Sequence, residues 1–76
     1  PTTFHGEVES SMPGTVLQLR VEPGDAVQAG DPLVVMESMK MEMTVEAPAA
    51  GTVREVCCGQ GDMVAVGQVL VRLDVA

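Results

Sequence analysis

Apolar residues recur along the chain at the period-two spacing of β-strands, in short segments that end at glycine-containing turns. Residues 23–25 (Pro-Gly-Asp) and 30–32 (Gly-Asp-Pro) mark two such turns in the first half, where each glycine supplies a tight bend or a positive φ. This pattern predicts an all-β domain of short strands. The residues expected to face inward are Val27, Leu33 and Val35 in the first half and Val64, Val69 and Val71 in the second.

The strand pattern occurs twice, because the chain matches itself at an offset of 37 positions without any gap. Between residues 8–37 and 45–74, 11 of 30 positions are identical. One half alone would leave its apolar face exposed, whereas two halves that face each other cover both. We therefore expect a flattened β-barrel or sandwich of about eight strands with internal pseudo-two-fold symmetry.

The domain organisation follows from the length and from this repeat. A chain of 76 residues forms one small domain with a thin core. We expect residues 1–7 to be an N-terminal tail or lead-in, and residues 8–76 to be the domain itself.

The junction between the two halves is a strand-like run over residues 33–46, which is longer than the usual strand of roughly 3–10 residues. The repeat places a break between Glu37 and about Met43, with Lys40 in the gap. No Gly, Asn or Pro marks a turn there, so the expectation of a hairpin rests on the symmetry alone.

Charge and composition narrow the choice of partners. The chain has 4 basic and 11 acidic residues, a net charge of −7, so it is not expected to bind nucleic acid or anionic lipid by charge. No apolar run has the length of a membrane span, and proteins are the expected partners. Lys40 is the only lysine, which reflects either a genome that favours arginine or a position where only an amine serves.

Cys57 and Cys58 are the only cysteines and are adjacent. Neighbouring cysteines rarely form an unstrained disulfide, and no Cys-x-x-Cys spacing is present for metal or redox chemistry. Two reduced thiols are typical of a cytoplasmic or mitochondrial-matrix protein.

Residues 37–43 read Glu-Ser-Met-Lys-Met-Glu-Met. This segment closely resembles the signature of biotinyl domains, in which the modified lysine lies between two methionines. The resemblance implies a flattened β-barrel of two four-stranded antiparallel sheets, with the lysine at the tip of a hairpin between the halves. It extends from about residue 8 to residue 74, through segments 11–16, 24–27, 30–33, 47–53 and 67–70.

The resemblance implies that Lys40 carries covalent biotin. A biotin protein ligase would couple biotin to the ε-amine through a biotinyl-adenylate. A biotin carboxylase would then carboxylate the ring with ATP and bicarbonate, and a carboxyltransferase would pass the carboxyl group to an acceptor. Met39 and Met41 are the implied recognition residues for the ligase and the partner enzymes, and Glu37 the implied acidic residue that helps ligase recognition.

The residue types fit a carrier without catalytic residues of its own. Arginine is no substitute for Lys40, because a guanidinium stays protonated and is a poor nucleophile. The acidic neighbours Glu37 and Glu42 favour the charged amine, so activation is expected from the ligase. The stretch from Val16 to Gly24 leaves no room for a "thumb" insertion, and the chain is similar to the thumbless carriers of acyl-CoA, pyruvate or urea carboxylases.

Three alternatives stay open. A lipoyl carrier domain has nearly the same fold, although lipoyl lysines usually follow an acidic residue and Lys40 has methionine on both sides. An unmodified structural module would leave Lys40 as an ordinary surface charge. The run of Met36, Met39, Met41 and Met43 offers thioethers for Cu(I), but no Cys or His joins it and strand alternation sends its members to both faces.

Overall fold

The computed structural model describes residues 5–75, and all regular secondary structure in that range is β-strand. Within that range no helix is long and apolar enough to cross a membrane. The strands are β1 (His5–Glu9), β2 (Gly14–Leu19), β3 (Ala26–Val27), β4 (Pro32–Ser38), β5 (Met41–Glu46), β6 (Gly51–Val56), β7 (Met63–Val64) and β8 (Val69–Val75).

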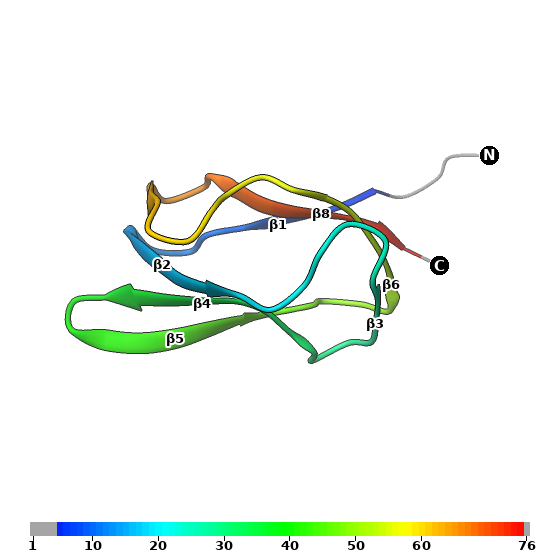
Figure 1. Cartoon of the computed structure of the whole chain (residues 1–76), viewed down its shortest axis with the longest axis horizontal. Coiled ribbons are helices and arrows are strands. Elements are labelled where there is room, and N and C mark those ends of the chain that lie inside the picture. Colours follow the sequence, from blue (N-terminus) through cyan, green and yellow to red (C-terminus); the bar gives the residue numbers. More distant parts are fainter. Residues whose placement is uncertain (1–4, 76) are drawn as a thin grey trace.

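The strands form two antiparallel four-stranded sheets that lie face to face (Figure 1). One sheet has the order β1-β8-β6-β3 and the other the order β5-β4-β2-β7. The expected all-β sandwich with two four-stranded sheets is thereby confirmed.

The two halves of the repeat are interlocked, since each sheet takes strands from both halves. The strands β2, β3 and β4 begin 37 positions before β6, β7 and β8. The hydrogen bonds between the halves come in matching pairs. The Gly24 amide donates to the Val53 carbonyl at 2.8 Å, and the Gly61 amide donates to the Val16 carbonyl at the same distance. Neither half is therefore complete without the other.

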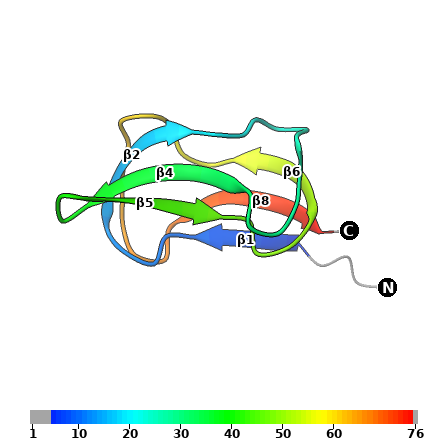
Figure 2. The same ribbon diagram turned by 90° about the horizontal axis from the view of Figure 1, so that it is seen from below.

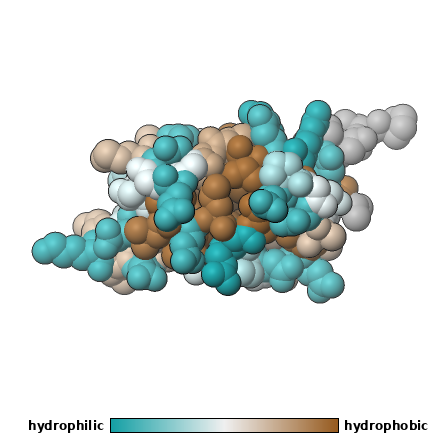
Figure 3. Space-filling view, viewed as in Figure 1, coloured by the Kyte–Doolittle hydropathy of each residue, from teal (hydrophilic) through white to brown (hydrophobic). Residues whose placement is uncertain are grey.

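The core lies between the sheets and consists of small and medium apolar side chains. Apolar residues also reach the surface near the middle of the face drawn in Figure 3. Burial of this apolar surface is the main stabilising contribution. The buried apolar residues are Val8, Val16, Val21, Val27, Leu33, Val34, Met36, Ala47, Val53, Val64, Leu70, Val71 and Leu73.

The strand register shifts at four places, and two of these β-bulges change which of the expected residues face the core. The register shifts past Leu33 in the β4–β5 pair and past Leu70 in the β1–β8 pair, and both leucines are 0% exposed. The expectation that Val35 and Val69 face inward is wrong: both are half-buried, and Val34 is buried instead. A bulge inserts one extra residue and interrupts the alternation on which that expectation depended. The inward positions of Val27, Leu33, Val64 and Val71 are confirmed.

The first strand begins at His5, before the boundary expected at residue 8. Residues 5–7 therefore belong to the sheet rather than to a tail, because the backbone of β1 pairs with β8, with His5 opposite Asp74. Residues 1–4 of the expected tail lie outside the described residues. The sequence of this segment is mostly polar and lacks the apolar alternation that indicates a strand, so the strand start could not be predicted. Backbone pairing with β8 holds it in the sheet.

The β4–β5 hairpin lies at one end of the long axis, and the two ends of the described chain lie at the other (Figures 1 and 2). This arrangement follows from the repeat. The offset of 37 relates β4 to β8 and β1 to β5. The loop that joins β4 to β5 is therefore related by symmetry to the place where the end of β8 lies beside the start of β1. The hairpin thus lies far from the points where further chain would continue.

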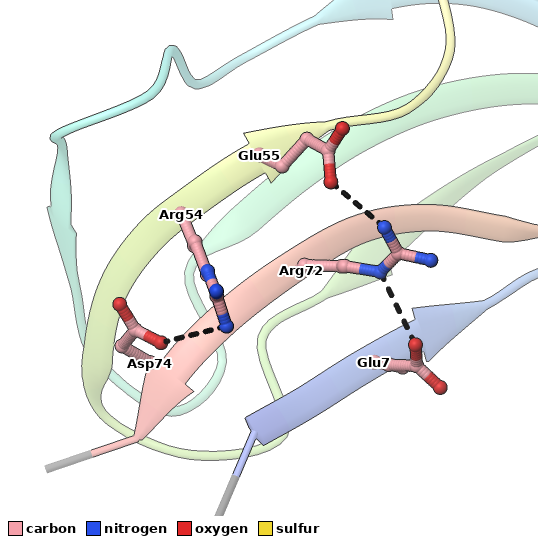
Figure 4. A network of polar contacts seen from close by, with 5 residues as sticks. All are labelled: Glu7, Arg54, Glu55, Arg72 and Asp74. Atoms are coloured by element: carbon pink, nitrogen blue, oxygen red, sulfur yellow. Dashed lines mark hydrogen bonds and ion pairs between the residues drawn. The ribbon is translucent and has the colours of Figure 1, made fainter.

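A set of ion pairs crosses the outer face of the β1-β8-β6-β3 sheet (Figure 4). Arg72 Nε donates to Glu7 Oε2 at 3.1 Å and its Nη1 donates to Glu55 Oε1 at 2.8 Å. Arg54 Nη1 lies 3.9 Å from Asp74 Oδ1. These side chains are about half exposed, so their contribution to stability is small.

Candidate functional site

Lys40 lies in the two-residue loop of the β4–β5 hairpin. Ser38 pairs with Met41 across the hairpin, so the loop consists of Met39 and Lys40, with φ of 53° and 67°. Positive φ at both positions is the type I′ arrangement, which usually has Asn-Gly. For L-residues it costs about 1–2 kcal/mol per position. The tip therefore holds two side chains in a conformation that their residue types disfavour.

The tip presents its side chains to solvent. Met39 is 84% exposed and Met41 is 67% exposed, and Lys40 and Glu37 are exposed as well. A narrow hydrophilic projection marks the end of the molecule in Figure 3 where Figure 1 shows the hairpin. The structure thus brings together all four residues that the sequence selected.

No residue in the described part of the chain forms a hydrogen bond or ion pair with the Lys40 ammonium group. Arg54 and Arg72 are in ion pairs, and Arg20 Nη1 donates to Gln18 Oε1 at 3.3 Å. Within residues 5–75, Lys40 is the one Lys or Arg side chain without a hydrogen bond or ion pair. Its amine is therefore accessible to another molecule.

The base of the hairpin is anchored by Ser38. Its side chain is buried, and Oγ donates a hydrogen bond to the Pro13 carbonyl at 2.6 Å. Next to it on the inner face, Met36 is buried and accepts a contact from Ser10 Oγ at 3.7 Å. Sequence reasoning missed this role of Ser38. The alternation expected from the sequence, with Leu33 and Val35 inward, placed Ser38 on the outer face, and only the bulge at Leu33 turns it inward.

A depression of about 430 Å³ lies beside the tip, lined by Thr15, Ser38, Met39, Lys40 and Met63 among others. Met63 comes from β7, far from the hairpin in sequence, and is 83% exposed. Sequence reasoning did not select Met63, because the proximity of β7 to the hairpin arises only from the order β5-β4-β2-β7.

The described residues contain no group of three or more His, Cys, Asp or Glu side chains that could hold a metal ion. The methionine run is divided between core and solvent. Met36 is 1% exposed whereas Met39 is 84% exposed, so these two thioethers do not converge on one side.

Cys57 and Cys58 are free thiols that lie half-buried at the end of β6. Burial raises the pKa of both, with Glu55 adding to the effect at Cys57 and Asp62 at Cys58. A raised pKa lowers the thiolate fraction at any given pH, and the thiolate is the nucleophile.

We expect both thiols to react with iodoacetamide more slowly than free cysteine at pH 8, with rates that keep rising above the pH where free cysteine levels off. Mass spectrometry of a timed alkylation series measures this. The same chain unfolded in urea is the control and should react at the free-cysteine rate. Equal rates for the folded and unfolded chain would contradict the protection by burial.

The chain is similar to parts of biotin-dependent enzymes. A family model described as "Biotin-requiring enzyme" matches residues 6–73. Pyruvate carboxylase from Bacillus subtilis is 41% identical over 74 residues, which is 97% of this chain and 6% of that enzyme. The chain therefore spans only a small part of this relative.

Solved structures show the same likeness in three dimensions. Urea carboxylase from Kluyveromyces lactis has a region with a TM-score of 0.88 and 30% identity, covering 96% of this chain and 6% of that one. The lipoyl domain of the 2-oxoglutarate dehydrogenase complex from Azotobacter vinelandii has a TM-score of 0.70 and 36% identity, covering 80% of this chain and 77% of that one.

Proposed function

The chain belongs to the family of biotin- and lipoyl-bearing domains, and from this premise we propose that it is a biotin carboxyl carrier, with biotin attached covalently to Lys40. The single observation that carries the proposal is an exposed, unpaired amine at the tip of a two-residue hairpin loop, between two exposed methionines. Once attached, biotin would hold the carboxyl group that passes from a biotin carboxylase to a carboxyltransferase.

The geometry supports attachment by an external enzyme. A tight hairpin at the end of the long axis presents the exposed Lys40 side chain away from the core, where an external enzyme can reach it. The neutral amine nitrogen attacks the acyl carbon of a biotinyl-adenylate. An amide bond forms, the bond between the acyl carbon and the phosphate oxygen breaks, AMP leaves and the amine gives up a proton. Lys40 acts here as substrate, and the chain supplies no catalytic residue.

Two features favour biotin over lipoate. Lys40 is flanked by Met39 and Met41, whereas lipoyl lysines usually follow an acidic residue. The likeness to the urea carboxylase region is also greater in TM-score than that to the lipoyl domain, 0.88 against 0.70.

The position of the tip supports a shuttling role. Further chain would continue from the end opposite the hairpin (Figure 1), so a connection to larger partners leaves Lys40 free to move. Tethering keeps a bound group at an effective concentration on the order of millimolar. The partners we propose are a biotin protein ligase, a biotin carboxylase and a carboxyltransferase.

We expect co-expression with a biotin protein ligase and biotin to label the chain at one site. Attachment removes one positive charge and changes the formal charge from −7 to −8. Intact mass, an avidin blot and a shift in isoelectric focusing measure the result, and the chain expressed without added ligase is the control. A lipoyl-sized adduct, or no adduct with an active ligase, would contradict the proposal.

A further inference from the structure

The two halves of the domain, residues 5–38 and 41–75, are joined covalently only through the loop of Met39 and Lys40, since both cysteines are free. Six pairs of strands occur within the described part of the chain. Four of them, β1–β8, β2–β7, β3–β6 and β4–β5, join one half to the other. Most of the strand pairing therefore lies between the halves, and each half needs the other as a partner.

The loop that joins the halves is strained. Met39 and Lys40 have φ of 53° and 67°, although neither is Gly, Asn or Asp, the residue types that tolerate this region. Every other residue with positive φ in residues 5–75 is a glycine. The conformational penalty is therefore concentrated at the one place where the chain passes from the first half to the second.

The sequence around the loop favours an extended chain. Residues 33–46 contain no Gly, Asn or Pro and consist largely of Val, Met, Thr and Glu, and the β-branched members of this set favour strands. In an extended conformation Met39 and Lys40 would have negative φ and no steric penalty. The turn is therefore imposed by packing between two halves of the same chain. A half from a second chain offers the same packing without the turn.

We propose that this hairpin opens and that two copies of the chain exchange halves. Residues 5–38 of each copy pair with residues 41–75 of the other, and Met39 and Lys40 run extended between two bodies that each repeat the fold described above. The exchanged dimer keeps every strand pair and relieves the strain in both chains, the condition that favours exchange. The hairpin lies at one end of the long axis (Figures 1 and 2), which leaves room for the two bodies to lie end to end.

Concentration and salt set the balance between the two forms. Association costs translational and rotational freedom, so the closed monomer predominates in dilute solution and the exchanged dimer at high concentration. The net charge of −7 on each copy opposes the dimer, and salt screens this repulsion. The halves separate only when the pairs between them break, so exchange takes place during refolding. The exchanged dimer has no hairpin tip, and it therefore lacks the geometry proposed for a carrier.

The first experiment refolds the chain from urea at high salt, at micromolar and at millimolar concentration, and measures the mass by size exclusion with light scattering. We expect a monomer at the lower concentration and a dimer at the higher. Met39→Asn combined with Lys40→Gly, the pair that type I′ turns prefer, should weaken the dimer about a hundred-fold. Met39→Ile should strengthen it, since β-branched residues tolerate positive φ least. Lys40→Arg is the control and should behave as the wild type, because it keeps the charge and the backbone preference.

The second experiment uses a disulfide to distinguish exchange from ordinary association. Glu7 and Arg72 lie directly opposite each other on β1 and β8, in different halves, at the spacing that a disulfide needs. Cys57→Ser and Cys58→Val remove the native thiols. Glu7→Cys with Arg72→Cys, refolded at millimolar concentration and treated with oxidised glutathione, should then run as a covalent dimer on a non-reducing denaturing gel. Glu55→Cys with Arg72→Cys is the matched control and should run as a monomer, because these residues face each other within the second half.

Three results would overturn the exchange. The first is a chain that stays monomeric after refolding at millimolar concentration. The second is a dimer that the double variant at Met39 and Lys40 forms as readily as the wild type. The third is a dimer whose two cysteine pairs give the same bands on the gel, since the contact between the copies is then not an exchange of halves. None of these measurements uses biotin or a ligase, so the exchange can fail while the carrier function stands, and the reverse.

Discussion

Replacing Lys40 with arginine is expected to abolish biotin attachment and to leave the fold intact. The guanidinium keeps the charge and the length of the side chain, but it stays protonated and is a poor nucleophile. Lys40 is exposed and has no bonded partner within residues 5–75, so its replacement removes no contact of the core. Intact mass after incubation with ligase, biotin and ATP measures labelling, and circular dichroism with thermal melting measures folding.

A second variant separates the amine from the backbone at this position. Lys40→Gly also removes the amine, and it relieves the positive φ of 67°, which glycine adopts without a steric penalty. We therefore expect an unlabelled domain that melts at the same temperature as the wild type or higher. Unfolding of both variants would mean that Lys40 has a structural role, and labelling of either would mean that biotin attaches elsewhere.

Replacing Gly51 with alanine is expected to destabilise the domain by about 1–3 kcal/mol, a large part of the total for a chain this small. A Cβ at Gly51 would overlap the Asp74 carbonyl oxygen and would lie 3.0 Å from the Asp74 carbonyl carbon. Backbone atoms cannot rotate away as a side chain does, so β6 and β8 would have to separate. Urea denaturation followed by circular dichroism measures the change in the free energy of unfolding.

Gly14 is the symmetry-related position, and a Cβ there would overlap the Glu37 carbonyl oxygen. We expect Gly14→Ala to lose a similar amount of stability, because β2 and β4 approach each other as closely there. Gly59→Ala is the control, since its Cβ would lie 3.5 Å from Asp62 Oδ2, an ordinary contact. A loss of stability at Gly59 equal to that at Gly51 would show that the close approach of strands is not the cause.

The repeat allowed much of the fold to be predicted. Matching residues at an offset of 37 located the pairs of strands and placed Lys40 in a hairpin that no turn residue marks. The wrong predictions, that Val35 and Val69 face inward, arose where the alternation of inward and outward side chains along a strand is interrupted. The bulges at Leu33 and Leu70 shift the alternation, and a bulge depends on two strands pairing, which one segment of sequence does not reveal.

The candidate site was predictable in its centre and not at its edges. Met39, Lys40 and Met41 are adjacent in sequence, so a local motif suffices to find them. Met63 and Thr15 line the depression beside the tip from two other strands, β7 and β2. These neighbours depend on the order of strands in the sheet.

The sequence by itself determined the strand content, the two-fold repeat and the reactive residue, because each depends on residue type and spacing along the chain. Only the tertiary structure decided which residues share the tip with Lys40, where Ser38 anchors the hairpin, and which glycines allow strands to approach closely. These features come from interlocking halves, in which each strand meets partners distant in sequence. Pairing of that kind is set by packing of the whole domain, and local patterns carry no information about it.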